Sequence, residues 1–307
     1  MSVTGLATPP PAAPHPPPPL LTGRSHDRAP KEYGFRAVLL ACLAVGVVFL
    51  TVLLSYVLLE GWPRLDLDLF RNQASQLRPA TAGAQAAIFG TLWLMALTAL
   101  IILPVGVMAA IYLEEYADKT RWYNRLIELN IQNLAAVPSV VYGILGLGLI
   151  VRGPLGLGPV VLAGAIILAL LVLPVVIISS REAVRAVPDS LRDGSLALGA
   201  TRLQTIWRTV LPNSIPGIAT GSILALSRAI GEAAPLIVIG VAGFLTFNPA
   251  AVSDRFTALP IQIYNYASRP QEDFIILSSA LIVVLLAILL IMNSAAIFIR
   301  NKYQRRW

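Results

Sequence analysis

The sequence has few residues suited to metal binding or covalent cross-linking: one cysteine, Cys42, and two histidines, His15 and His26, in 307 residues. A single cysteine cannot form a disulfide within the chain. The two histidines lie near the N-terminus with no further His or Cys cluster beside them, so there is no metal-ligand spacing. The same scarcity excludes a catalytic triad based on histidine.

Charged residues are also scarce. They form 13% of the chain, whereas soluble domains contain about a quarter. Hydrophobic residues form 56% and the mean hydropathy is +0.73, which predicts a polytopic membrane protein. The net charge of +7 comes from basic residues scattered through short loops. Because they form no continuous basic stripe, we expect a lipid bilayer and no nucleic acid as the partner.

Six apolar runs are each long enough to cross the hydrocarbon layer, so we expect an all-α fold with six transmembrane helices. The third run contains Asn130, Gln132, Asn133 and Pro138, which predicts a helix that faces protein or a water-filled path. The six runs are residues 37–59, 84–112, 129–151, 159–180, 216–241 and 274–299.

The chain is expected to have three parts. Residues 1–33 hold nine of the 23 prolines and almost no large apolar residues, which predicts an extended or disordered tail. The tail lacks the apolar core of a signal peptide, so the first apolar run is expected to remain as an anchor. Residues 34–83 are then expected to form the first transmembrane helix and an external loop, and residues 84–307 the main transmembrane domain.

The distribution of Lys and Arg predicts the orientation. With six alternating spans, sixteen basic residues fall on the side of the two termini and six on the other side. Basic residues are enriched in cytoplasmic loops, so both termini are expected to be cytoplasmic.

One hydrophilic segment, residues 181–212, interrupts the apolar runs. Its charges cannot lie in hydrocarbon, so we expect it in the cytoplasm. The charged residues are Arg181, Glu182, Arg185, Asp189, Arg192, Asp193, Arg202 and Arg208.

The pattern within this segment predicts a helix, a turn and an amphipathic helix. Pro188 suits a helix start, and Gly199 is expected to break that helix. Thr201 and Gln204 have capping-box spacing, and Pro212 is expected to stop the second helix. On pattern alone, two surface helices that merely pack on the membrane face remain an alternative.

Three separated motifs in this chain resemble one family of membrane proteins. Residues 187–212, 138–148 and 225–237 resemble the PstA-type permeases of phosphate importers, and the resemblance covers about residues 84–299. The first motif resembles the loop shared by permease subunits of binding-protein-dependent ABC importers, although the family's Glu-Ala-Ala is Asp-Gly-Ser here, and Thr209 stands where isoleucine is usual. The positions that match the coupling motif are Asp193, Gly194, Ser195, Gly199, Leu211 and Pro212.

The resemblance implies the type I ABC importer permease fold (MetI-like) in the plasma (inner) membrane of a prokaryote. It implies three partners: a PstC-type permease subunit, a PstB-type ATPase that receives the coupling segment in a cleft, and a periplasmic or extracellular phosphate-binding protein. The chain's own residues agree with a separate ATPase, because Lys31, Lys119 and Lys302 follow Pro, Asp and Asn and never the Gly of a Walker A loop. ATP is therefore expected to be used by the partner, with no cofactor bound by this chain.

The fifth run carries two charges, Arg228 and Glu232, four residues apart and hence on one helix face. A planar guanidinium matches phosphate oxygens, so we expect Arg228 to contact the cargo transiently and Glu232 to tune that contact. Alternatively, the two charges simply neutralise each other.

The sequence is also compatible with other functions. Arg228 would serve sulfate or molybdate equally well, and the chain could be the sister PstC-type subunit. A membrane scaffold for phosphate sensing could use the same cytoplasmic loops. An ion-driven carrier would be expected to carry more intramembrane carboxylates.

Overall fold

The computed structural model describes residues 29–118 and 120–303. The predictions for residues 1–28 of the Pro-rich tail therefore lie outside the described residues. Residues 29–33, which were assigned to that tail, instead begin a helix. The described residues are almost entirely helical or in turns, with a single isolated β-bridge between Val160 and Arg255.

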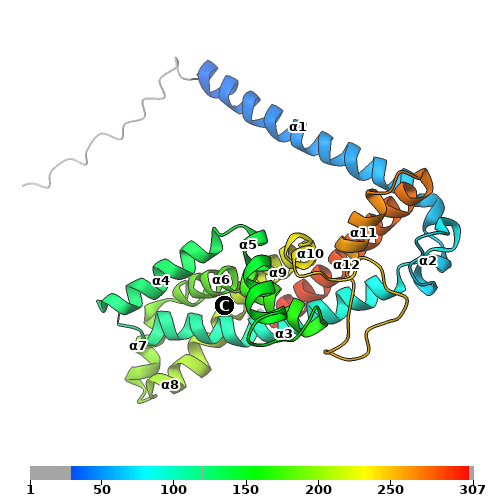
Figure 1. The fold of residues 1–307 in the computed structure, drawn as a ribbon. Coiled ribbons are helices and arrows are strands. Elements are labelled where there is room, and N and C mark those ends of the chain that lie inside the picture. Colours follow the sequence, from blue (N-terminus) through cyan, green and yellow to red (C-terminus); the bar gives the residue numbers. More distant parts are fainter. Residues whose placement is uncertain (1–28, 119, 304–307) are drawn as a thin grey trace, which may run out of the picture. The chain divides into compact units, whose positions relative to one another are not determined.

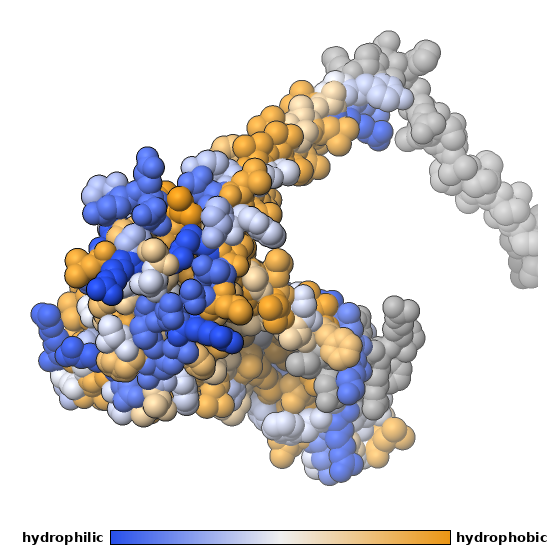
Figure 2. Space-filling view, turned by 90° about the vertical axis from the view of Figure 1, so that its right-hand side faces the viewer, coloured by the Kyte–Doolittle hydropathy of each residue, from blue (hydrophilic) through white to orange (hydrophobic). Residues whose placement is uncertain are grey.

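The chain divides into two units, residues 1–53 and residues 54–307. The described part of the first unit is the N-terminal stretch of α1 (Ala29–Gly61). Every side chain from Glu32 to Leu53 is exposed, and most are apolar. A helix that is apolar on all sides suits a lipid environment, and Figure 2 shows mostly hydrophobic residues along the visible face of α1.

The second unit contains the remaining elements. They include short 3₁₀ helices (η2, η3) and single π-helical turns (η4, η5, η6). The elements are η2 (Trp62–Arg64), α2 (Leu67–Arg71), η3 (Pro79–Thr81), α3 (Gln85–Ile111), η4 (Tyr112–Tyr116), α4 (Trp122–Ala135), α5 (Ser139–Gly146), η5 (Leu147–Val151), α6 (Val161–Arg185), α7 (Asp189–Ala197), α8 (Arg202–Thr205), η6 (Ile206–Val210), α9 (Leu211–Ile230), α10 (Ala234–Val238), α11 (Leu259–Ala267) and α12 (Glu272–Tyr303).

Helices α3, α6 and α9 pack together at the centre of this unit (Figure 1). Their inward faces carry fully buried aliphatic side chains such as Ile102 and Leu168. Small residues let α9 approach α6 closely, because a Cβ at Gly221 would lie 2.1 Å from the hydroxyl oxygen of Ser179. Such small-residue contacts are typical of helices that associate within membranes.

The third predicted span is not a straight helix. Helix α4 ends at Ala135, and α5 with η5 continues after a bend of 104° between residues 122–135 and 139–151. Pro138 lies at the bend, where its ring and missing N–H prevent a continuous helix. The hydroxyl of Tyr142 donates to the carbonyl of Leu134 at 2.8 Å and links the two arms. The prediction of one continuous helix over residues 129–151 was therefore wrong.

Within the described residues, five helices are long and apolar enough to cross a membrane. The predicted number of six is reached when the bent pair is taken as one span. The five lie at Glu32–Arg64, Gln85–Tyr116, Val161–Arg185, Arg202–Ile230 and Glu272–Lys302.

The two ends of the bundle differ. Helices α7 and α8 lie at one end, whereas α2 and α11 lie at the other (Figure 1). Figure 2 views the end with α2 and α11, where hydrophilic residues gather. There Arg64 donates to the carbonyls of Pro79, Ala80 and Ala82 at 2.8–2.9 Å, which holds the loop before α3 in place.

Candidate functional site: the turn at Gly199 and the Arg228 region

The predicted turn at Gly199 is present and has a defined geometry. Gly199 has φ +86°, a left-handed conformation that favours glycine. Its N–H donates to the carbonyl of Leu196 at 2.9 Å, and the next N–H, of Ala200, donates to that of Ser195 at 3.2 Å. These two bonds form a Schellman motif that ends α7. The glycine is therefore needed for the turn itself.

The second helix of the segment begins with the predicted capping box. The hydroxyl of Thr201 accepts the backbone N–H of Gln204, and the Gln204 side chain accepts the backbone N–H of Thr201 at 2.9 Å. The backbone N–H groups of Thr201 and Gln204, which have no partner within the helix, are therefore both satisfied. The turn from Gly199 to Thr201 consequently joins a well-defined helix end to a well-defined helix start.

Pro212 does not stop the second helix, contrary to the prediction. The chain remains helical from Arg202 to Ile230. The π-helical turn η6 lies directly before Leu211 and Pro212. Because a π-turn changes the local hydrogen-bond pattern, it can accommodate a residue that lacks an N–H. The amphipathic helix and the next membrane helix are thus one continuous element.

The motif residues of α7 are largely exposed. Asp193 and Gly194 are exposed, whereas Ser195 is half-buried and its hydroxyl lies 3.0 Å from that of Thr205. Leu198, at the turn, is 92% exposed. An exposed apolar side chain beside a hydrogen-bonded turn is a feature that a protein partner can bind.

Glu114 contributes a buried ion pair that sequence reasoning missed. It lies on η4, at the end of α3, and its carboxylate is 3.5 Å from the guanidinium of Arg181. The two side chains are only 6% and 9% exposed. Arg185 and Glu128 extend the cluster, at 3.1 Å from Glu114 and 3.0 Å from Arg181 respectively. Arg181 and Arg185 were assigned to the cytoplasmic segment, but both lie on α6.

The neighbouring residue, Glu115, forms a second set of contacts. Its carboxylate lies 3.1 Å from Arg192 of α7. Its backbone carbonyl accepts a hydrogen bond from Arg202 of α8, and this guanidinium also lies 5.2 Å from the ring centroid of Tyr116. The η4 turn therefore contacts α6, α7 and α8.

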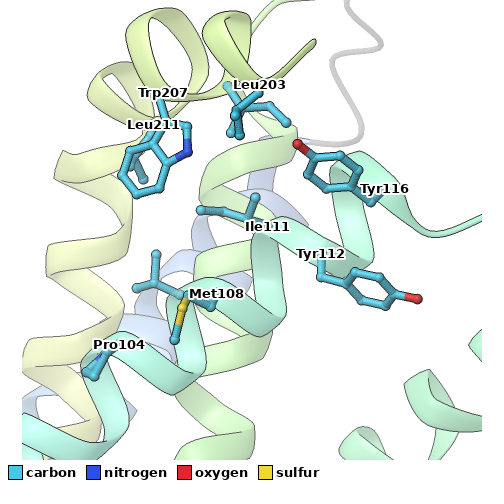
Figure 3. Close-up of a pocket in the computed structure, with 10 residues that line it drawn as sticks. Pro104, Met108, Ile111, Tyr112, Tyr116, Leu203, Trp207 and Leu211 are labelled. Carbon is cyan, nitrogen blue, oxygen red and sulfur yellow. The ribbon is translucent and has the colours of Figure 1, made fainter.

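An apolar groove of about 470 Å³ lies between the end of α3 and the helix that begins with α8 and η6 (Figure 3). Trp207, Leu203 and Leu211 line one side, and Met108, Ile111 and Tyr116 line the other. Trp207 is 60% exposed. Side chains are thus not closely packed between these two helices at this end of the unit.

The structure brings Arg228 and Glu232 together but changes their setting. The Nε of Arg228 donates to Oε1 of Glu232 at 3.5 Å. Helix α9 ends at Ile230, so Glu232 lies just beyond the helix, and the prediction that both residues occupy one continuous helix over residues 216–241 was wrong. Among the described residues, neither terminal nitrogen of Arg228 has a hydrogen-bond partner, and its side chain is 48% exposed. Arg228 therefore has donors available for an anion.

The helical bundle, the exposed turn at Gly199 and the half-exposed guanidinium of Arg228 near the end of a membrane helix are features expected of a polytopic membrane permease. Residues 102–305 match the sequence profile of the binding-protein-dependent transport system inner membrane component, and the chain belongs to this family.

Several curated proteins are similar to this chain. The probable ABC transporter permease protein YqgI of Bacillus subtilis is 34% identical over 196 residues, which are 64% of this chain and 66% of that protein. The phosphate transport system permease protein PstA 1 of Mycobacterium tuberculosis is 36% identical, with 62% and 60% covered. PstA of Haemophilus influenzae is 32% identical, with 75% and 79% covered. The chain thus matches slightly less than two thirds of the first two relatives.

Solved structures share the fold. A bacterial alginate ABC transporter, solved in complex with an alginate pentasaccharide-bound periplasmic protein, has a chain that aligns with a TM-score of 0.63 at 18% identity, covering 89% of this chain and 96% of that chain. The inward-facing MetNI methionine ABC transporter aligns with a TM-score of 0.56 at 18% identity, covering 72% and 97%. The all-α, type I ABC importer permease fold predicted from the sequence is confirmed.

Proposed function

We propose that this chain is one of two membrane subunits that form the translocation path of an ATP-driven importer for inorganic phosphate. The observation that carries this proposal is the continuous helix Arg202–Ile230, which joins the hinged segment at one end to Arg228 near the other. The relatives named as phosphate transport permeases support phosphate as the cargo.

We infer three partners from the resemblance to phosphate importers. A PstC-type permease subunit would complete the path, and an external phosphate-binding protein would deliver the cargo. A PstB-type ATPase would bind the segment that contains Asp193, Gly194, Ser195 and Gly199 and would supply all ATP hydrolysis. Leu211 and Pro212 would carry the resulting movement into α9. With the termini in the cytoplasm, α7 and α8 face the ATPase, and residues 84–307 act as the permease domain.

Arg228 is proposed to bind phosphate transiently. Its terminal nitrogens can donate two parallel hydrogen bonds to the oxyanion. Glu232 accepts a hydrogen bond from Nε of Arg228. Its negative charge also weakens anion binding nearby, so that phosphate can leave. A half-exposed site with one cation binds phosphate weakly. Weak binding suits transport, in which phosphate must leave the site again.

The proposal is tested by transport through the complete importer in lipid vesicles. Labelled phosphate, sulfate and molybdate are offered in turn with ATP on the cytoplasmic side. We expect uptake of phosphate that depends on both ATP and the binding protein. Preferred uptake of sulfate or molybdate would reassign the cargo, and the absence of any uptake by an intact complex would leave the scaffold function as the better account.

A further inference from the structure

Helix α7 is placed by polar contacts. None of its residues is buried, so hydrophobic burial does not hold it against the bundle. Its two ends are fixed by the chain, through the turn after α6 and the Schellman motif at Gly199. Between these ends, Arg192 and Ser195 provide its side-chain links to other elements.

Arg192 makes the largest set of these links. Its guanidinium lies 3.1 Å from the carboxylate of Glu115 and donates to the carbonyls of Val184, at 2.8 Å, and Val187. The side chains of Arg192 and Glu115 are only 16% and 11% exposed. An ion pair shielded to this degree, with further hydrogen bonds, is stronger than a solvated surface pair.

Glu115 connects α7 to a membrane helix. It lies in the last turn of the continuous helix Gln85–Tyr116, which packs along α6. Arg202 also contacts this turn, through the carbonyl of Glu115 and the ring of Tyr116. The end of α3 is therefore linked to the segment on both sides of Gly199. The adjacent apolar groove leaves little direct packing to replace these links (Figure 3).

We propose that Glu115 and Arg192 are positioning residues that make α3 move together with the coupling segment. This inference rests on the proposed function, in which an ATPase moves α7. With the pair intact, displacement of α7 acts on α6 through the chain and on α3 through the ion pair. Without the pair, α7 shifts against α3, and ATP hydrolysis no longer opens the path efficiently.

The test measures phosphate uptake and ATP hydrolysis in the same vesicles containing the complete importer. Glu115→Ala and Arg192→Ala are each expected to lower uptake per ATP hydrolysed by about fivefold or more, the range of a coupling between distant sites. The double variant should match Arg192→Ala alone, because Glu115 then has no partner left to lose. Glu115→Gln retains an acceptor oxygen and should stay within about twofold of the parent.

Arg121→Ala is the matched control. It removes a cation near the same turn, from a pair with Asp118 whose side chains are 64% and 52% exposed, and it should leave the ratio unchanged. A parent ratio in the assembled Glu115→Ala importer would overturn the inference, as would a double variant whose loss is the product of the single losses. If Arg192→Ala fails to assemble, the contrast between Glu115→Ala and Glu115→Gln decides alone. A parent complex that transports no phosphate contradicts the proposed function instead.

Discussion

Arg181 and Glu114 form an ion pair of 3.5 Å at the junction of α6 and α3, with less than a tenth of either side chain exposed. Glu128 and Arg185 complete the cluster, so each member of the pair has a second ionic partner. A shielded pair of this kind is costly to break, because the remaining charge cannot return to water. The cluster therefore fixes the end of α3 against α6, directly before the turn that leads to α7.

Arg181→Met is expected to destabilise the permease. It leaves the shielded Glu114 with one ionic partner fewer, and breaking a buried pair costs about 3 kcal/mol. The midpoint of thermal unfolding in detergent should fall clearly for Arg181→Met. Arg121→Met, which removes one partner of an exposed pair, should change the midpoint little. Equal midpoints for the two variants would contradict this account of the cluster.

Gly199→Ala should impair the coupling segment. A left-handed conformation costs an alanine roughly 1–2 kcal/mol, although a Cβ there would meet no neighbouring atom within 4 Å. The expected result is weaker retention of the ATPase and lower phosphate uptake. Gly46→Ala is the control within α1, where the added methyl also has open space and should favour the helix by about 1 kcal/mol. Full uptake with Gly199→Ala would show that the turn geometry is dispensable.

Arg228→Gln tests the proposed contact with the cargo. Hydrogen bonds to a charged group contribute about 1.5–3 kcal/mol, so phosphate uptake below saturation should fall by roughly tenfold or more. Arg228→Lys keeps the charge without the planar fork and should fall in between. Arg152→Gln removes an exposed charge from a loop and should transport normally. An assembled Arg228→Gln importer with the parent rate would refute the contact.

The loop before α11 should depend on pH through Asp254. Its carboxylate accepts the N–H groups of Ala250 and Ala251, both at 2.9 Å, and these bonds hold its pKa below the usual range. A lowered pKa stabilises the loop above the pKa of an unfolded aspartate, about 3.9, and the effect is lost as the pH falls through the lowered value.

Hydrogen exchange of the Ala250 and Ala251 amides measures this effect. Asp254→Ala should reduce their protection factors several-fold at pH 7, and the difference from the parent should vanish in acid. Glu272→Ala, at the start of α12, serves as the control. Protection in the parent that stays constant through the acidic range would exclude Asp254 as the cause.

The sequence predicts this protein best where structure is local. The glycine turn and the capping box at Thr201 need only residues a few positions apart, and both are present as expected. The pairing of Glu115 with Arg192 spans 77 positions and depends on how the helices pack, so no local pattern reveals it. The sequence carries one signal of this pairing. Glu114 and Glu115 are consecutive acids at the end of an apolar run, and residues 181–212 contain several arginines.

Three errors have physical causes. Pro138 produced a sharp bend in a run that hydropathy alone treats as continuous. Pro212 failed to end a helix because the preceding π-turn accommodates it. Helix α9 ends at Ile230, so Glu232 lies outside it. The four-residue spacing of Arg228 and Glu232 carries no information about where the helix stops. In each case the backbone's hydrogen-bond pattern decided the outcome.

The π-turn before Pro212 has a mechanical consequence. Because it keeps the chain helical from Arg202 to Ile230, these 29 residues span about 40 Å at 1.5 Å per residue. A tilt of only about 5° would displace its far end by roughly 3 Å, by simple geometry on that length. Such a displacement exceeds the tolerance of a hydrogen bond. A small tilt at Trp207 is therefore enough to make or break the proposed contact between Arg228 and phosphate.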